Sequence, residues 1–151
     1  MNCYYFDTSA FLKRYVEEKG STYVSRMLED GVPVILATVT YTEMLMALRK
    51  KKSEQALSPA DYSAAVQDIT SDWVEMNVLP IDDGFHGEVR RIADELRHDR
   101  HLKALDAIHL ASALVVRQKY TDMIFMTSDR QLKHVATEFN FVVDDPEQHE
   151  E

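Results

Sequence analysis

Short runs of apolar residues alternate with longer stretches of helical periodicity along the chain. Five of these runs have the length and the content of β-branched and aromatic residues that are typical of buried strands. They cover residues 3–6, 32–37, 78–81, 123–126 and 141–143. The runs are almost continuously apolar, which indicates strands covered on both faces, as in a parallel sheet.

The segments between these runs are predicted to be helical. The expected helices cover residues 10–16, 22–30, 39–52, 58–76, 82–97, 102–120 and 129–137. Ser58 and Pro59 mark a clear helix start, because serine caps a first turn and proline suits the first helical position. Strands that alternate with helices imply right-handed crossovers and a parallel sheet with helices on both faces, which is an α/β fold.

Length and composition fit one soluble domain. The chain has 151 residues, of which 45% are hydrophobic and 28% are charged, and these values are typical of a globular protein. Cys3 is the single cysteine, so an intramolecular disulfide is excluded and a reducing compartment is expected. We see no signal-peptide pattern and no run of about 18 apolar residues. A cytoplasmic protein without a membrane segment is therefore expected.

The formal net charge of −9 argues against simple electrostatic coating of nucleic acid. Five acidic residues crowd the C-terminus, at positions 144, 145, 147, 150 and 151. Without these five, 21 acidic residues face 17 Lys and Arg, which leaves a charge of −4. We expect the folded domain to cover residues 1–145 and the acidic tail, residues 146–151, to be disordered.

Four acidic residues lie where a predicted strand ends or a predicted helix begins: Asp7, Glu43, Asp106 and Asp129. Helix capping is an alternative explanation for Asp7 and Asp129, and Glu43 could close a capping box with Thr40. Asp106 lies in a helix that is apolar almost all round. A buried carboxylate there is costly unless it is paired, hydrogen-bonded or bound to a metal.

The topology predicts that these four carboxylates meet. Helices in βαβ units run antiparallel to the strands, so that their N-termini gather at the carboxyl edge of the sheet, where ligands bind. Four acids so close together would repel each other, and a hard divalent cation such as Mg²⁺ or Mn²⁺ would relieve this repulsion. A metal held by carboxylates, with positions left for water, suits phosphodiester hydrolysis.

Three further side chains are candidates for supporting these acids. Ser9 and Thr127 could donate hydrogen bonds to the carboxylates, or could merely cap helices. His109 follows Asp106 by one helical turn on the same face. We expect His109 to support a ligand or to pack in the core, rather than to bind the metal itself.

The same segments resemble those of the PIN-domain ribonucleases, and most closely those of the VapC-type toxins of toxin–antitoxin pairs. The resemblance covers about residues 2–145 and is carried by residues 5–10 with 13–15, by Glu43, by residues 105–111 and by residues 127–132. It implies a three-layer α/β/α sandwich with a mostly parallel sheet of about five strands. It also implies Mg²⁺- or Mn²⁺-dependent endoribonuclease activity, a homodimer and inhibition by a small antitoxin.

The resemblance also implies roles for the four acids. Asp7 and Asp106 would hold the main metal, Asp129 would join them directly or through water, and Glu43 would orient or deprotonate the attacking water. Candidates for contact with the RNA backbone are basic residues that could equally be ordinary surface. They are Arg49, Lys50, Lys51, Lys52, Lys13, Arg14, Lys103 and Arg130.

Two other functions are alternatives to an endoribonuclease. One is a metal-dependent phosphatase of the haloacid dehalogenase type, which also has an aspartate after its first strand. That chemistry needs a second acid two residues later, whereas this chain has Ser9 there. The other is a non-enzymatic PIN scaffold that acts only through protein contacts, and the presence of all four acids argues against it.

Overall fold

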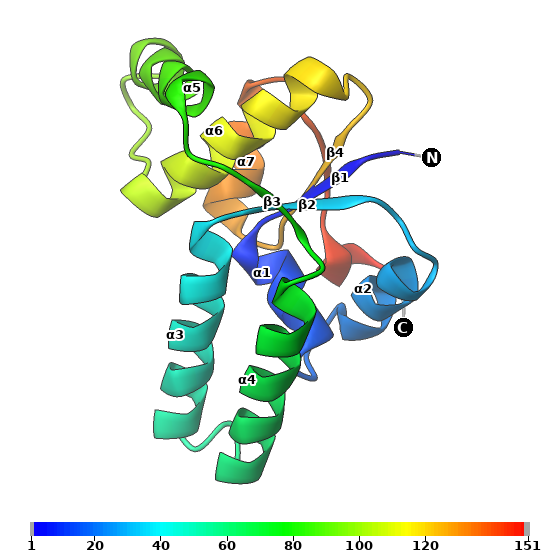
Figure 1. Cartoon of the computed structure of the whole chain (residues 1–151). Coiled ribbons are helices and arrows are strands. Elements are labelled where there is room, and N and C mark those ends of the chain that lie inside the picture. Colours follow the sequence, from blue (N-terminus) through cyan, green and yellow to red (C-terminus); the bar gives the residue numbers. More distant parts are fainter. Residues whose placement is uncertain (1, 150–151) are drawn as a thin grey trace.

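The computed structural model describes residues 2–149, and within them a five-stranded sheet forms the centre (Figure 1). The strands are β1 (Tyr4–Phe6), β2 (Val34–Ala37), β3 (Asn77–Leu79), β4 (Ile124–Met126) and β5 (Val142–Asp144). Their order is β3-β2-β1-β4-β5, and every neighbouring pair is parallel. The predicted parallel sheet is therefore confirmed, with the first strand of the chain at its centre.

The helices lie close to their predicted positions. They are α1 (Thr8–Phe11), α2 (Ser21–Glu29), α3 (Val39–Ser53), α4 (Pro59–Trp73), α5 (Asp83–Glu95), α6 (Ala104–Lys119) and α7 (Arg130–Glu138), with 3₁₀ turns η1 (Leu12–Arg14) and η2 (Pro146–Gln148). The first helix is shorter than expected, since α1 tightens into η1 after one turn. Ser58 caps α4 as predicted, because its Oγ accepts a hydrogen bond from the backbone N–H of Asp61 at 3.0 Å.

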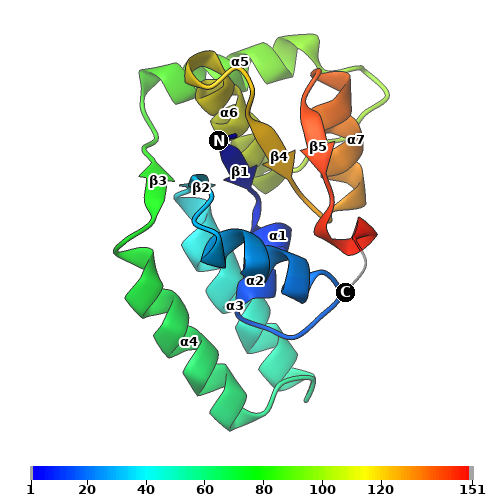
Figure 2. The same ribbon diagram turned by 90° about the vertical axis from the view of Figure 1, so that its right-hand side faces the viewer.

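Two apolar cores cover the two faces of the sheet. Side chains alternate along each strand, so that Tyr5 and Phe125 pack against α5, α6 and α7. Phe6 and Met126 point to the opposite face and pack with residues of α1, α2, α3 and α4. Figure 2 shows the two helical layers on either side of the strands. The three-layer α/β/α arrangement is therefore confirmed.

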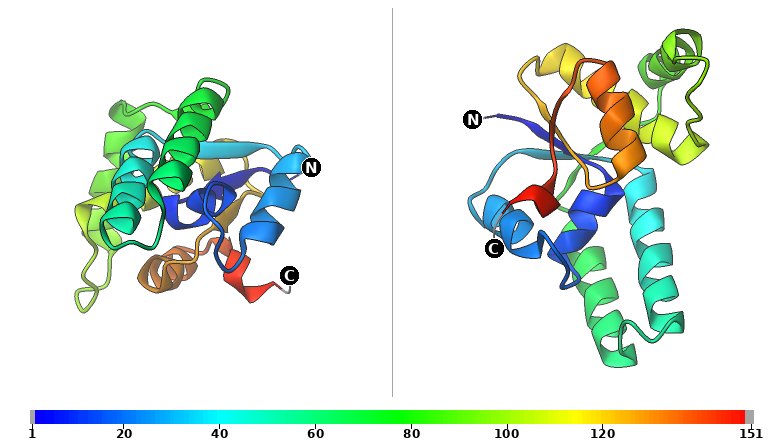
Figure 3. Two further views of the ribbon diagram at one scale, coloured as in Figure 1. Left: turned by 90° about the horizontal axis from the view of Figure 1, so that it is seen from below. Right: turned by 180° about the vertical axis from the view of Figure 1, so that it is seen from behind.

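Helices α3 and α4 form an antiparallel hairpin that projects beyond the sheet (Figure 3). The aromatic rings of Tyr41 and Trp73 join the two helices near the sheet, with their centroids 5.4 Å apart. None of the helices within residues 2–149 has the length and hydrophobicity that crossing a lipid bilayer requires.

The C-terminal segment differs from the sequence-based expectation. We expected disorder from Pro146 onwards, whereas the structure shows η2 packed beside α2 (Figure 1). Pro146 is buried, the ring of His149 stacks on Tyr23 at 3.7 Å, and the Lys13 Nζ lies 3.4 Å from Glu147 Oε2. The expectation is therefore wrong for residues 146–149, while residues 150 and 151 lie outside the described part of the chain.

Candidate active site

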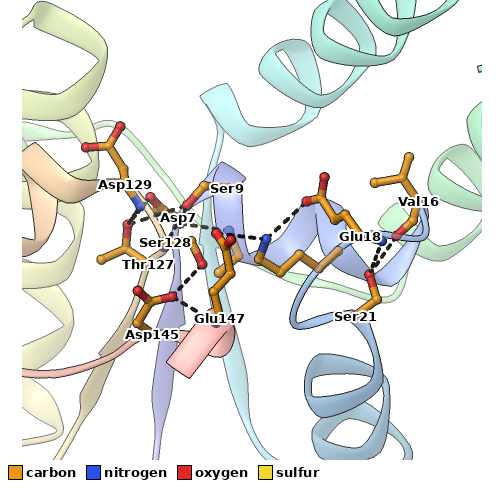
Figure 4. A network of polar contacts seen from close by, with 12 residues as sticks. Asp7, Ser9, Val16, Glu18, Ser21, Thr127, Ser128, Asp129, Asp145 and Glu147 are labelled. Atoms are coloured by element: carbon orange, nitrogen blue, oxygen red, sulfur yellow. Dashed lines mark hydrogen bonds and ion pairs between the residues drawn. The ribbon is translucent and has the colours of Figure 1, made fainter. Parts of the chain in front are cut away.

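Asp7 is buried where β1 ends and α1 begins. Its side chain is 3% exposed, and it caps α1, since Oδ1 accepts hydrogen bonds from the Ala10 N–H at 3.0 Å and from Ser9 Oγ at 2.8 Å. Oδ2 accepts a hydrogen bond from Thr127 Oγ1 at 2.6 Å (Figure 4). Asp7 is thus both a helix cap and a buried carboxylate supported by the two hydroxyls that the sequence singled out.

The charge state of Asp7 depends on its burial and on its neighbours. Burial raises the pKa of the Asp7 carboxyl, although the neighbouring His109 and the hydrogen bonds from Thr127, Ala10 and Ser9 act in the opposite direction. Within residues 2–149, no lysine or arginine forms a salt bridge with Asp7. The ionised form therefore lacks the cationic partner that a buried carboxylate normally requires.

Glu43 does not form the capping box that the sequence suggested. Helix α3 has Thr38 as its N-cap residue, and Thr40 Oγ1 is buried without a hydrogen-bond partner. The Glu43 carboxylate instead turns to a distant segment, where Oε1 lies 2.6 Å from His109 Nε2 and accepts a hydrogen bond from Thr8 Oγ1 at 2.7 Å. The capping explanation of Glu43 is therefore wrong.

His109 connects Glu43 to the core of the sheet. Its Nδ1 lies 2.6 Å from the hydroxyl of Tyr5, which is fully buried on β1. Burial and the charge of Asp7 raise the pKa of Tyr5, so that its hydroxyl stays protonated. Because the Glu43 carboxylate can only accept, Nε2 carries a proton and donates a hydrogen bond to Oε1.

This contact keeps Glu43 ionised. Burial by itself raises the pKa of the Glu43 carboxyl, but the hydrogen bond and charge of His109 and the hydrogen bond from Thr8 outweigh it and hold the pKa below its ordinary value. Glu43 Oε2 makes no hydrogen bond with the described residues. That oxygen is available as an acceptor.

Asp106 and Asp129 complete the acidic edge. Asp106 lies in the first turn of α6, and its pKa is raised by burial and then by the negative charges of Asp129 and Glu43. Asp129 caps α7, because its Oδ1 accepts a hydrogen bond from the Leu132 N–H at 2.8 Å. The structure therefore places all four predicted acids at one edge of the sheet, where Asp106 feels the charges of Asp129 and Glu43.

The donor chemistry of this edge suits a hard divalent cation. Its side chains offer carboxylate oxygens, while His109 is engaged by Glu43 and Tyr5. Three acidic, histidine or cysteine side chains do not converge on one point anywhere in residues 2–149. Mg²⁺ needs no such group, since it keeps several waters and takes one or two carboxylates directly. The residues present fit such an ion in donor type and in charge.

Sequence reasoning missed two residues of this network. Tyr5 could have been found, because alternation along β1 places it on the same face as the helix that carries His109. Asp145 carried no such signal, since it belongs to an acidic stretch next to the expected tail. Its Oδ1 accepts a hydrogen bond from Ser128 Oγ at 2.7 Å, beside Asp129 (Figure 4).

The sequence of this chain is similar to those of known proteins. The model of the PIN domain matches residues 4–138. Two curated relatives, Ribonuclease VapC45 and Ribonuclease VapC49 of Mycobacterium tuberculosis (strains CDC 1551 / Oshkosh and ATCC 25618 / H37Rv), are each 29% identical over 112 residues, which are 74% of this chain and 75% of the relative.

Solved structures share the fold. FitAcB from Neisseria gonorrhoeae gives a TM-score of 0.67 at 16% identity over 95% of this chain and 97% of that chain. VapBC-1 from nontypeable Haemophilus influenzae gives a TM-score of 0.64 at 15% identity over 95% of this chain and 98% of that chain. Together with the match that spans residues 4–138, these similarities show that the chain belongs to the PIN domain family.

Proposed function

We propose that this protein is a divalent-metal-dependent endoribonuclease that acts as the toxin of a toxin–antitoxin pair. The observation that carries the proposal is the buried carboxylate of Asp7, which forms no salt bridge with a lysine or arginine of residues 2–149 and lies at the same edge as three other acids. The name ribonuclease, borne by the two curated relatives, supports RNA as the substrate.

Asp7 and Asp106 would hold the ion, with Asp129 joining directly or through a water molecule. Mg²⁺ and Mn²⁺ are the expected ions, because both prefer oxygen ligands. When bound, such an ion polarises a phosphate oxygen, lowers the pKa of a coordinated water and stabilises the leaving oxygen. Ser9 and Thr127 would keep the Asp7 oxygens oriented through the hydrogen bonds described above.

Glu43 would position the attacking water and accept its proton at Oε2. The other oxygen, Oε1, is held by Thr8 and His109, so that Oε2 has a defined direction. The lowered pKa keeps Glu43 ionised at neutral pH, which a proton acceptor requires. His109 and Tyr5 act behind it as a rigid support that links the base to β1.

The structure narrows the choice of RNA-binding cations. Lys13 is 4% exposed and pairs with Glu18 and Glu147, and it is therefore not available to a phosphate. Arg14, Lys50 and Lys51 also form salt bridges, and Lys52 lies over the ring of Tyr62. The candidates with neither a salt bridge nor a cation–π contact among the described residues are Arg49, Lys103 and Arg130. Lys103 and Arg130 flank the acidic edge, since they immediately precede α6 and follow Asp129.

A small antitoxin and a second copy of this chain are the proposed protein partners. Both follow from the resemblance to the VapC-type toxins, and solved structures of similar fold bear the names VapBC-1 and FitAcB. Size-exclusion chromatography with light scattering on the isolated chain tests the homodimer. Co-expression with the product of an adjacent short reading frame tests the antitoxin.

RNA cleavage by the purified protein tests the proposed function directly. Wild type should cut RNA only when Mg²⁺ or Mn²⁺ is supplied, and 5′-end mapping should show defined cleavage sites. Asp7→Asn should lose cleavage and Mn²⁺ binding, whereas Asp68→Asn, an exposed acid on α4, should keep both. Equal cleavage by Asp7→Asn would contradict the assignment.

The same samples separate the competing functions. Hydrolysis of a small phosphoester without RNA cleavage would favour a phosphatase. Growth inhibition that survives substitution of the four acids, combined with no RNA cleavage by wild type, would favour a non-enzymatic scaffold.

A further inference from the structure

Asp145 connects the C-terminal segment to the acidic edge. It is 8% exposed and follows β5, and its two carboxylate oxygens serve different partners. Oδ1 accepts hydrogen bonds from Ser128 Oγ at 2.7 Å and from the Glu147 N–H at 2.9 Å. Oδ2 forms a salt bridge with Lys133 on α7. Neither the sequence motifs nor the proposed mechanism uses this carboxylate.

Ser128 passes the contact on to Asp7. While its hydroxyl donates to Asp145, its backbone N–H donates to Ser9 Oγ at 3.0 Å. The Ser9 hydroxyl in turn donates to Asp7 Oδ1 at 2.8 Å. Figure 4 shows this continuous series of contacts from Asp145 to Asp7. The Ser9 hydroxyl therefore accepts from Ser128 and donates to Asp7, and these two contacts fix its orientation.

Ser128 also lies in the short loop between β4 and α7 that carries Asp129. The Asp129 backbone N–H donates to Thr127 Oγ1 at 3.0 Å, and Thr127 Oγ1 donates to Asp7 Oδ2. The hydrogen bond from Ser128 to Asp145 thus holds a loop that contacts both carboxylate oxygens of Asp7, one through Ser9 and the other through Thr127. Two of the four acids depend on the position of this loop.

The C-terminal segment is itself held on both sides of Asp145. Tyr23 donates a hydrogen bond to Asp144 at 2.6 Å, and Lys13 pairs with Glu147. Gly20 permits the close approach of Pro146, since an added Cβ would lie 3.0 Å from Pro146 atoms. The segment therefore offers Asp145 a rigid base, which a side chain needs if it is to orient another.

We propose that Asp145 is a positioning residue for the metal-binding carboxylates, which acts on Asp7 through Ser128 and Ser9. This inference rests on the proposed function, because it takes Asp7 to be a metal ligand. Partners outside the ligand shell typically change metal affinity by about tenfold or more when removed. Asp145→Ala is expected to weaken Mn²⁺ binding by about tenfold, the lower end of that range, because it acts through two intervening residues.

Mn²⁺ binding by isothermal titration calorimetry tests the proposal on the full chain. Asp145→Ala and Ser128→Ala should weaken binding to the same extent, and Ser128→Ala keeps the test valid if loss of Asp145 impairs folding. If the effect passes through Ser9, the double variant Asp145→Ala/Ser9→Ala should bind no more weakly than Ser9→Ala alone. Additive losses in the double variant would overturn the proposed route.

Asp144→Ala is the matched control. It removes an acid from the adjacent position and frees Tyr23 and His149, but it leaves the contact between Asp145 and Ser128 in place. The control removes one support of the segment and should therefore bind Mn²⁺ more tightly than Asp145→Ala does, whereas an equal loss in the control would show general loosening of the segment and overturn the proposal. RNA cleavage adds a second readout, since excess Mn²⁺ should restore the kcat of Asp145→Ala.

The two proposals fail in different ways. Wild type that binds no Mn²⁺, or binds it independently of Asp7, would overturn the proposed function and this inference together. Wild type that binds Mn²⁺ through Asp7, with unchanged binding by Asp145→Ala, would overturn this inference alone.

Discussion

At the scale of the residue, Asp7 shows a conflict between stability and the proposed function. Burial raises the pKa of its carboxyl, and the unfolded chain therefore loses that proton more readily than the folded chain. A carboxyl whose folded pKa is raised lowers the stability of the fold as the pH rises above the unfolded pKa, and the loss is complete above the folded pKa. The protein keeps a destabilising charge at a position where a neutral side chain could also cap the helix.

Asp7→Asn is therefore expected to make the metal-free protein more stable at neutral pH. Mn²⁺ at a hundred times its dissociation constant should stabilise wild type by about 2.7 kcal/mol and the variant by much less. Urea unfolding in EDTA and in Mn²⁺ measures both effects, with Asp68→Asn as the control. A variant that is less stable than wild type in EDTA would show that the three hydrogen bonds to the carboxylate outweigh its burial.

Tyr5 is expected to matter through a single hydrogen bond. Tyr5→Phe keeps the ring in the core but leaves the buried Nδ1 of His109 without its hydrogen-bond partner. Leaving a buried polar group unpaired costs about 1–3 kcal/mol. Urea unfolding should show this loss for Tyr5→Phe, and kcat should fall more than KM rises, because Glu43 depends on His109.

Tyr4→Phe is the matched control for Tyr5→Phe, since Tyr4 precedes Tyr5 on β1 and packs on the opposite face of the sheet. It should leave kcat unchanged. A similar fall in kcat for both variants would assign the effect to β1 as a whole.

At the scale of the element, the periodicity of apolar residues predicted most helices and strands. It could do so because the residues within an element largely determine whether that element is a helix or a strand. The cap of α4 at Ser58 was local and was confirmed. The capping box that was the alternative explanation of Glu43 does not form, since the partner of Glu43, His109, lies 66 residues away. The ordered segment from Pro146 was missed for the same reason, because Lys13 and Gly20 hold it from the other end of the chain.

The two left-handed glycines provide a test of how η2 is held. Gly20 and Gly31 both have positive φ, at 91° and 74°, but only Gly20 has neighbours within 4 Å of an added Cβ. Gly31→Ala should cost about 1–2 kcal/mol, the strain of a left-handed alanine alone. Gly20→Ala should cost more, because the new methyl group also pushes against Pro146.

Urea unfolding compares the two glycine variants, and limited proteolysis reports on the C-terminus. Gly20→Ala should release residues 146–149 to protease, while Gly31→Ala should protect them as wild type does. Equal stability losses, with the C-terminus protected in both variants, would mean that the contact between Gly20 and Pro146 does not hold η2 in place.

At the scale of the whole molecule, an acidic protein is proposed to act on a polyanion. The net charge is −9, and half of the basic residues that the sequence offered for RNA contact are already in salt bridges with described residues. Long-range attraction therefore contributes little to binding, and the acidic edge would repel phosphate without a cation. Binding should rest on the ion and on a few nearby charges such as Lys103 and Arg130.

This balance predicts a shallow salt dependence. Each contact with a phosphate of single-stranded nucleic acid contributes a slope of about −0.7 to the dependence of log affinity on log salt. Two or three contacts then lower kcat/KM by about sevenfold to eighteenfold between 50 and 200 mM KCl at fixed Mn²⁺, whereas a strongly basic interface loses about a thousandfold or more.

Lys103→Gln should reduce the measured slope by about 0.7, whereas Lys50→Gln should not, because Lys50 is already paired with Glu54. A thousandfold loss of kcat/KM over this range of salt would show that more cations reach the RNA than the salt bridges within residues 2–149 leave available. An equal salt dependence of kcat/KM in both variants would show that Lys103 does not contact the RNA.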